Sequence, residues 1–138
     1  MGKFYLPLFA LLVTAAIGSG DMADKIKIQN ENVVKAAAAE LSKTLPKRVD
    51  PFTQLVAISA EGQMLAYTFK IDAAPKSDET IIKEGAERMK RNVTAGICAT
   101  SNRFLQSGIV ISYRYISAAT GRELFRYDIK ESDCDTLR

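Results

Sequence analysis

Hydrophobic and polar residues alternate in two neighbouring segments near the C-terminus. In both segments the odd-numbered positions are apolar, and these are Ile109, Ile111, Tyr113, Tyr115, Phe125, Tyr127 and Ile129. A period of two in segments rich in Ile, Tyr and Phe predicts two half-buried β-strands, over residues 108–115 and 123–130. The link Ala119-Thr120-Gly121 fits a three-residue turn that ends with Gly in the left-handed conformation. The pattern therefore predicts a β-hairpin.

The turn also predicts the register of this hairpin. With Ala118 opposite Arg122, all the apolar odd-numbered residues share one face, whereas a slip of one residue would mix both faces. The predicted pairs are Tyr115 with Phe125, Tyr113 with Tyr127, Ile111 with Ile129, Ile116 with Leu124, Ser112 with Asp128 and Arg114 with Arg126.

Arg114 and Arg126 are the candidate contact residues of the chain. Like charges opposite each other on two strands are mildly destabilising. The simpler interpretation is that two exposed arginines splay apart, helped by Asp128 and Glu123. The alternative is a site where both arginines bind an anion or an acidic partner.

A first helix is predicted between a capping residue, Asn30 or Asn32, and the break at Pro46. Its apolar face has helical spacing and comprises Val34, Ala37, Ala38, Leu41 and Leu45. The segment from Pro46 to Pro51 is predicted to be a turn or an extended connector outside regular structure.

Two further strands are predicted over residues 52–60 and 64–72. The register of this pair stays open. A two-residue loop would align Ile58 with Leu65, a three-residue loop would align Ala57 with Leu65, and a β-bulge would shift either alignment.

A second helix is predicted after Ser77, which can cap it and is followed by two acidic residues that suit the helix dipole. Its apolar stripe, predicted to be core, comprises Ile82, Ala86, Met89 and Val93. Residues 99–106 fit a short helical turn. The tail after Lys130 is acidic and is predicted to be disordered apart from Cys134.

The predicted order is helix, strand, strand, helix, strand, strand. This order favours an α+β fold with a four-stranded antiparallel sheet and both helices packed on one face. The 138 residues suffice for one domain with its own core, which we place at residues 30–138.

Residues 1–20 resemble a targeting segment. A lysine at position 3 precedes the apolar run LPLFALLVTAAI at residues 6–17, and small residues follow it. This layout is typical of a secretory signal peptide cleaved after Gly18 or Gly20. A retained membrane anchor is the alternative, although a spanning helix needs about 20 apolar residues. Polar residues 21–29 are predicted to be a linker.

The chain has two cysteines, and both follow the targeting segment. In an oxidising compartment an even number of cysteines predicts a disulfide, here Cys98–Cys134. The loop closed by this bond would stabilise the fold by roughly 3–4 kcal/mol. We therefore expect a periplasmic or secreted protein, or a domain in the periplasm anchored to the inner membrane.

The composition excludes several classes of function. The chain has no histidine, which excludes Ser-His-Asp and Cys-His catalysis and the commonest zinc ligand. The net charge of +3, in a well-mixed chain, is not that of a nucleic-acid-binding protein. We expect no metal, no cofactor and no enzymatic activity, because the candidate carboxylates are scattered: Asp50, Glu61, Asp72 and Asp128.

Four tyrosines could line a ligand groove or belong to the core. Alternation places them with Ile and Phe, which favours the core. They are Tyr67, Tyr113, Tyr115 and Tyr127.

Several stretches resemble a group of small exported bacterial proteins without an assigned function. They are residues 45–50 (LPKRVD), residues 108–115 (GIVISYRY), and Thr53, Leu55, Leu65, Tyr67, Cys98 and Gly121. The resemblance implies a bacterial periplasmic or envelope location and supplies no catalytic residues.

Two functional hypotheses follow. The first is a non-catalytic interaction module of the bacterial envelope: an inhibitor, an immunity-like protein or an assembly accessory protein that binds another envelope protein. The second is a membrane-anchored structural component of an envelope complex. In both, the membrane is contacted only through the N-terminal segment.

Overall fold

The computed structural model describes the backbone of residues 6–137 and the side chains of residues 21–137. Five strands form one sheet in the order β1-β2-β3-β4-β5. The elements are α1 (Leu6–Ser42), β1 (Lys47–Asp50), β2 (Thr53–Glu61), β3 (Met64–Ile71), α2 (Asp78–Thr100), α3 (Asn102–Gln106), β4 (Val110–Ser117), β5 (Glu123–Ile129) and the 3₁₀ helix η2 (Glu131–Leu137).

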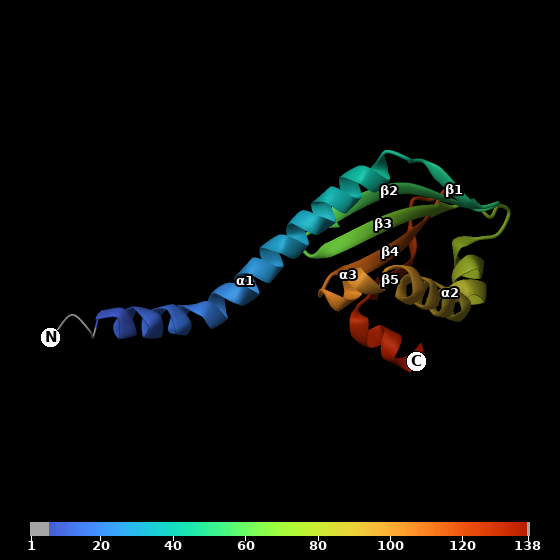
Figure 1. Cartoon of the computed structure of the whole chain (residues 1–138). Helices are drawn as coiled ribbons and strands as arrows, with labels where there is room; N and C mark the ends of the chain where they lie inside the picture. The colour runs from blue at the N-terminus through green and yellow to red at the C-terminus, as the bar shows by residue number, and fades with distance from the viewer. Residues whose placement is uncertain (1–5, 138) are drawn as a thin grey trace.

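The fold class is α+β, but the predicted four-stranded antiparallel sheet is wrong. β3 and β4 run parallel, with Leu65 beside Ile111. Parallel neighbours need a long crossover connection, and α2 and α3 provide it. The sheet is therefore mixed, and the parallel pair joins its two hairpins at the centre (Figure 1).

The sheet has one strand more than predicted. This additional strand is β1, which forms in the segment predicted to be a connector. It pairs antiparallel with β2, with Lys47 opposite Leu55. The two prolines that argued against a strand, Pro46 and Pro51, flank β1, and β1 lies at the edge of the sheet. Proline is tolerated there because its missing N–H interrupts no ladder in the sheet interior.

The β4–β5 hairpin has the predicted register over most of its length. Ile111 pairs with Ile129, Tyr113 with Tyr127, Arg114 with Arg126 and Tyr115 with Phe125. Gly121 has the expected positive φ of 76°. The predicted pairings of Ile116 with Leu124 and of Ala118 with Arg122 are wrong. The register shifts after Tyr115 and places Ile116 opposite Glu123, and the Ser117 N–H donates a hydrogen bond to the Arg122 carbonyl at 2.8 Å.

The β2–β3 hairpin has neither of the two registers considered. Ile58 pairs with Tyr67 and Ala60 with Leu65, around a tight turn in which Gly62 has a φ of 61°. A further irregularity lies between Leu55 and Ala57. The difference arises at the turn: Glu61 pairs with Met64, which leaves Gly62 and Gln63 as the loop and moves the pairing two residues away from an alignment of Ile58 with Leu65.

The predicted start of the first helix at Asn30 or Asn32 is wrong. α1 already begins at Leu6, so residues 21–29, predicted to be a linker, are part of the helix (Figure 1). Their side chains are exposed. Asn30 is buried instead of capping a helix. Its Nδ2 donates hydrogen bonds to Gln63 Oε1 at 2.9 Å and to the Ser107 carbonyl at 2.8 Å.

The predicted signal peptide or anchor comprises residues 1–20, and the structure does not describe the side chains of these residues. Within residues 21–137, no helix combines the length and the apolar character that crossing a membrane requires.

The two long helices share one hydrophobic core with the sheet. α1 packs on β2 and β3, and α2 packs on β4 and β5. The buried core includes Val34 and Ala38 of α1, Val93 and Ile97 of α2, and Leu65, Phe69, Ile111 and Tyr115 of the strands. Ser77 caps α2 as predicted, because its Oγ accepts a hydrogen bond from the Thr80 N–H at 3.2 Å.

The C-terminal tail is ordered, contrary to the prediction of disorder. Residues Glu131–Leu137 form η2. Cys98 and Cys134 form a disulfide, in agreement with the predicted pairing, and Cys134 is buried. The bond attaches the tail to α2, so the chain after β5 packs against the domain.

Candidate functional site: a groove beside α2

A groove of about 820 Å³ opens between α2 and the β1 side of the sheet. Its floor is the core face of β3 and β4, between the areas that α1 and α2 cover. One wall is α2, and the other is formed by β1 and the loop before α2. The apolar lining comprises Val49, Phe52, Phe69, Ile71, Ile81, Met89, Val93, Ile97, Tyr113, Tyr115 and Phe125.

Aromatic rings form the floor of the groove. The parallel pairing of β3 and β4 sets Phe69 beside Tyr115, with stacked rings whose centroids are 4.7 Å apart. The Phe69 ring also lies 4.9 Å from that of Tyr113. The tyrosines therefore pack with apolar residues as predicted, while two of them also line the groove.

Tyr113 and Tyr115 both line the groove, and neither hydroxyl oxygen is a buried atom without a hydrogen-bond partner. The Tyr127 hydroxyl donates to the Ala86 carbonyl at 3.1 Å. The groove floor thus carries two tyrosines whose hydroxyls can bond to water or to a bound segment.

These tyrosines stay neutral at physiological pH. Burial, followed by the neighbouring Tyr113, raises the pKa of Tyr67 to about 12. Burial also raises the pKa of Tyr113 and, together with Tyr113, Tyr127 and Asp50, that of Tyr115. Neutral hydroxyls can both donate and accept hydrogen bonds.

Two glycines shape the α2 wall in different ways. A Cβ atom at Gly85 would lie 3.3 Å from the Phe125 ring, so this glycine allows α2 to approach β5 closely. A Cβ atom at Gly96 would meet no atom within 4 Å. Gly96 therefore faces open groove, between exposed Asn92 and Thr100 on the same side of α2.

The rim on the β1 side is apolar and exposed. Val49 is 55% exposed and Phe52 is 60% exposed, and both line the groove. Apolar surface that continues from a groove onto its rim is typical of sites that bind another macromolecule.

Four charged residues line the groove, and two of them pair. Lys76 Nζ lies 2.8 Å from Glu84 Oε2, and the hydrogen bond and charge of Lys76 lower the pKa of Glu84. Arg88, on α2, also contributes to that lowering, but it forms no ion pair within the described residues. Asp50, on β1, likewise forms no ion pair there; its Oδ1 accepts a hydrogen bond from the Phe52 N–H at 2.8 Å. Opposite walls thus carry one unpaired cation and one unpaired anion.

Arg114 and Arg126 lie on the other face of the sheet, away from the groove. Arg114 Nη2 is 3.0 Å from Glu61 Oε1, and Arg126 Nε is 3.3 Å from Asp128 Oδ1. The side-chain Nε of Arg114 is buried without a hydrogen-bond partner. Binding of an anion or partner by these two arginines stays a prediction, and such a ligand would compete with the two carboxylates.

The predicted carboxylates lie on different surfaces. Asp50 lies in the groove, whereas Glu61 and Asp128 bind arginines on the opposite face. Within residues 21–137, no group of three or more Cys, Asp or Glu side chains could hold a metal ion.

The sequence indicated a groove only as the alternative for the four tyrosines, of which Tyr113 and Tyr115 line it, and predicted none of its walls. Its α2 wall could have been suspected from the spacing of Arg88, Asn92, Gly96 and Thr100, which lie four residues apart on one side of a helix. Its rim had a weaker signal, since Val49 and Phe52 are apolar residues in a segment bounded by prolines.

Searches with the sequence find no matching protein-family model and no matching curated protein. Solved structures do match. A Pseudomonas aeruginosa protein described as secreted superposes with a TM-score of 0.70 at 14% identity, over 79% of this chain and 96% of that one. Two type II secretion system pilotins are also similar in structure: EpsS of Vibrio vulnificus (TM-score 0.64, 15% identity, 81% of this chain and 97% of that one) and AspS of Vibrio cholerae (TM-score 0.60, 15% identity, 81% and 98%). At these identities the similarity is one of fold.

Proposed function

We propose that this protein is a non-catalytic accessory protein of the bacterial envelope, which binds an apolar helical segment of another envelope protein in the groove beside α2. The observation that carries the proposal is the open apolar groove with its exposed apolar rim. The shared fold with two pilotins of secretion systems agrees with a role in assembly. The predicted signal peptide and disulfide agree with a location in the envelope.

The shape of the groove suits a helix. Its α2 wall extends from Ile81 to Thr100, which corresponds to about 28 Å at the rise of an α-helix. A helix that lies in an apolar groove buries one face and leaves the other in water. The exposed rings and branched side chains of Phe52 and Val49 would then cover the flank of the bound helix.

The proposal is tested by site-specific photo-crosslinking in the cell that produces the protein. The photoreactive residue p-benzoylphenylalanine replaces Gly96, which faces the open groove. We expect a discrete crosslinked product, and mass spectrometry should locate the crosslink in an apolar segment of another envelope protein.

Ala95 is the matched control, because it is exposed on α2 next to Gly96 and does not line the groove. The same photoreactive residue at Ala95 should give no such product. Equal products from the two positions, or a product from neither, would contradict binding in the groove.

A further inference from the structure

The two unpaired charges of the groove lie on opposite walls, Arg88 on α2 and Asp50 on β1. Lys76 and Glu84, the other charged residues of the lining, already pair with each other. A bound helix would therefore meet a cation along one flank and an anion along the other.

The polar groups on the β1 side reinforce this asymmetry. Burial raises the pKa of Tyr115, and the negative charge of Asp50 contributes in the same direction. Tyr115 lines the same groove as Asp50, and its neutral hydroxyl can accept a hydrogen bond from a group bound there. A carboxylate next to a hydroxyl suits an ammonium or guanidinium group, which only donates hydrogen bonds.

We infer that the groove selects an amphipathic helix with an acidic residue on one edge of its apolar face, paired with Arg88, and a basic residue on the other edge, paired with Asp50 and the Tyr115 hydroxyl. This inference rests on the proposed function and adds the charge pattern of the bound segment. Opposite charges on the two walls also determine the direction in which the helix lies, because reversing the helix exchanges its two edges. Electrostatic complementarity of this kind contributes more to specificity and register than to total affinity.

The test uses fluorescein-labelled peptides of about 18 residues, enough for a helix as long as the groove. All four share one Leu/Ala apolar face and differ only in the two residues at its edges: Glu and Lys, Glu and Glu, Lys and Lys, or Gln and Gln. Fluorescence anisotropy measures the Kd of each peptide for the full chain. The mixed Glu/Lys peptide should bind the wild-type protein about three- to fivefold more tightly than the Glu/Glu or the Lys/Lys peptide. The preference should weaken in 0.5 M NaCl, because salt screens partly exposed charges.

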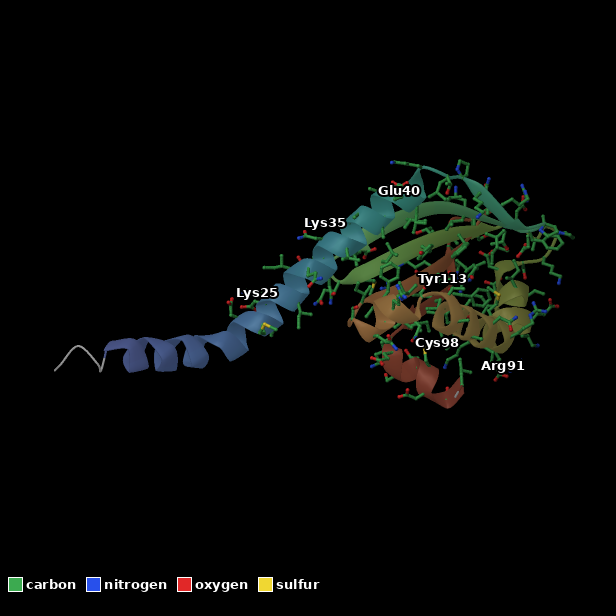
Figure 2. The ribbon with its side chains drawn as sticks, viewed as in Figure 1. Lys25, Lys35, Glu40, Arg91, Cys98 and Tyr113 are labelled. Atoms are coloured by element: carbon green, nitrogen blue, oxygen red, sulfur yellow. A yellow bond between two sulfur atoms is a disulfide. The ribbon has the colours of Figure 1, made fainter. Side chains whose placement is uncertain are left out.

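Two variants move the preference in predictable ways. Arg88→Glu makes both walls negative, so the Lys/Lys peptide should become the tightest ligand. Asp50→Asn removes the negative charge but keeps the oxygen that accepts from Phe52, so the Glu/Glu peptide should bind as tightly as the mixed one. Arg91→Glu is the control, because Arg91 is an exposed cation of α2 outside the groove lining (Figure 2); it should leave the order of affinities unchanged.

The outcomes separate this inference from the proposed function. The inferred charge pattern is wrong if the wild type and Arg88→Glu bind the four peptides in the same order of affinity. It is also wrong if Arg91→Glu changes this order as much as Arg88→Glu does. In both cases the proposed binding in the groove is not contradicted. The proposed function and the inference are both overturned if none of the four peptides binds the folded wild-type protein. They are also overturned if all four peptides bind Gly96→Trp as tightly as the wild type, because the indole at this position would project into the groove.

Discussion

At the scale of single residues, Ser112 stabilises the ionised form of Asp128 on the face of the sheet opposite the helices. It is fully buried, and its Oγ donates a hydrogen bond to Asp128 Oδ1 at 2.6 Å. Burial acts to raise the pKa of Asp128, but the hydrogen bond from Ser112 and the charges of Arg126 and Arg114 outweigh it, so the pKa lies below its ordinary value. The folded state therefore favours the ionised carboxylate. That stabilisation is present above the ordinary Asp pKa and is lost as the pH falls through the folded-state pKa.

Ser112→Ala should therefore lower the free energy of unfolding at pH 7 by about 1–2 kcal/mol, because it removes a buried hydrogen bond to a charged group. Urea denaturation at several pH values measures this. The difference in the free energy of unfolding between Ser112→Ala and the wild type should become smaller at a pH below the ordinary pKa of Asp, because the Asp128 carboxylate becomes protonated there. Ser59→Ala, at an exposed serine of β2, should change the stability by less than about 0.5 kcal/mol at every pH. If Ser112→Ala lowers the free energy of unfolding by the same amount at every pH, the hydrogen bond from Ser112 does not stabilise the ionised Asp128 carboxylate.

At the scale of elements, the disulfide attaches η2 to α2. Cys98 lies near the end of α2 and Cys134 in η2, 36 residues further along the chain. The bond encloses α3 and the whole β4–β5 hairpin. Closing a loop of this length reduces the entropy of the unfolded chain, which is the usual source of the stability that a disulfide contributes.

Replacing both cysteines by alanine should lower the free energy of unfolding by about 3 kcal/mol. Guanidinium denaturation of the wild-type protein with and without reductant provides the comparison. The reduced wild type should approach the stability of the double variant, and reductant should leave that variant unchanged. If oxidised and reduced wild type unfold at the same denaturant concentration, the disulfide does not contribute this stability.

At the scale of the whole molecule, α1 extends beyond the domain that it helps to form (Figure 1). Lys25 lies on the projecting part, whereas Lys35 and Glu40 lie where α1 runs along the sheet (Figure 2). Residues 21–29 are exposed, and Asn30 is the first buried residue among the side chains of α1 that the structure describes. The ion pairs of the projecting part, Lys25 with Asp21 and Lys27 with Glu31, involve exposed or half-exposed side chains. Pairs of this kind contribute little to stability.

A chain that begins at Asp21 and one that begins at Gln29 should therefore have free energies of unfolding within about 0.5 kcal/mol of each other. Asn30→Ala in the longer chain should cost about 1–3 kcal/mol, because it leaves the Ser107 carbonyl and the Gln63 amide without their buried partner. Thermal and urea denaturation compare the three proteins. A loss of stability on removing residues 21–28 as large as that of Asn30→Ala would show that the projecting helix contributes to the fold.

The sequence by itself determined the features that depend on neighbours along the chain. The period-two alternation predicted the β4–β5 register from Ile111 to Tyr115, since a slip of one residue would expose Tyr113 and Tyr127. Ser77 as a helix cap followed from local chemistry, and two cysteines allowed only one intramolecular pairing.

The tertiary structure decided what depends on contacts between distant segments. No local pattern indicates that β3 lies parallel to β4, that a segment bounded by prolines forms β1, or that β2 has a bulge near Val56. The same holds for the groove. Its floor exists because the parallel pairing sets Phe69 beside Tyr115 and because α1 and α2 cover different parts of the sheet. Side-chain alternation assigns each residue to a face of its strand, but only the packing of the helices determines which part of that face stays open to a partner.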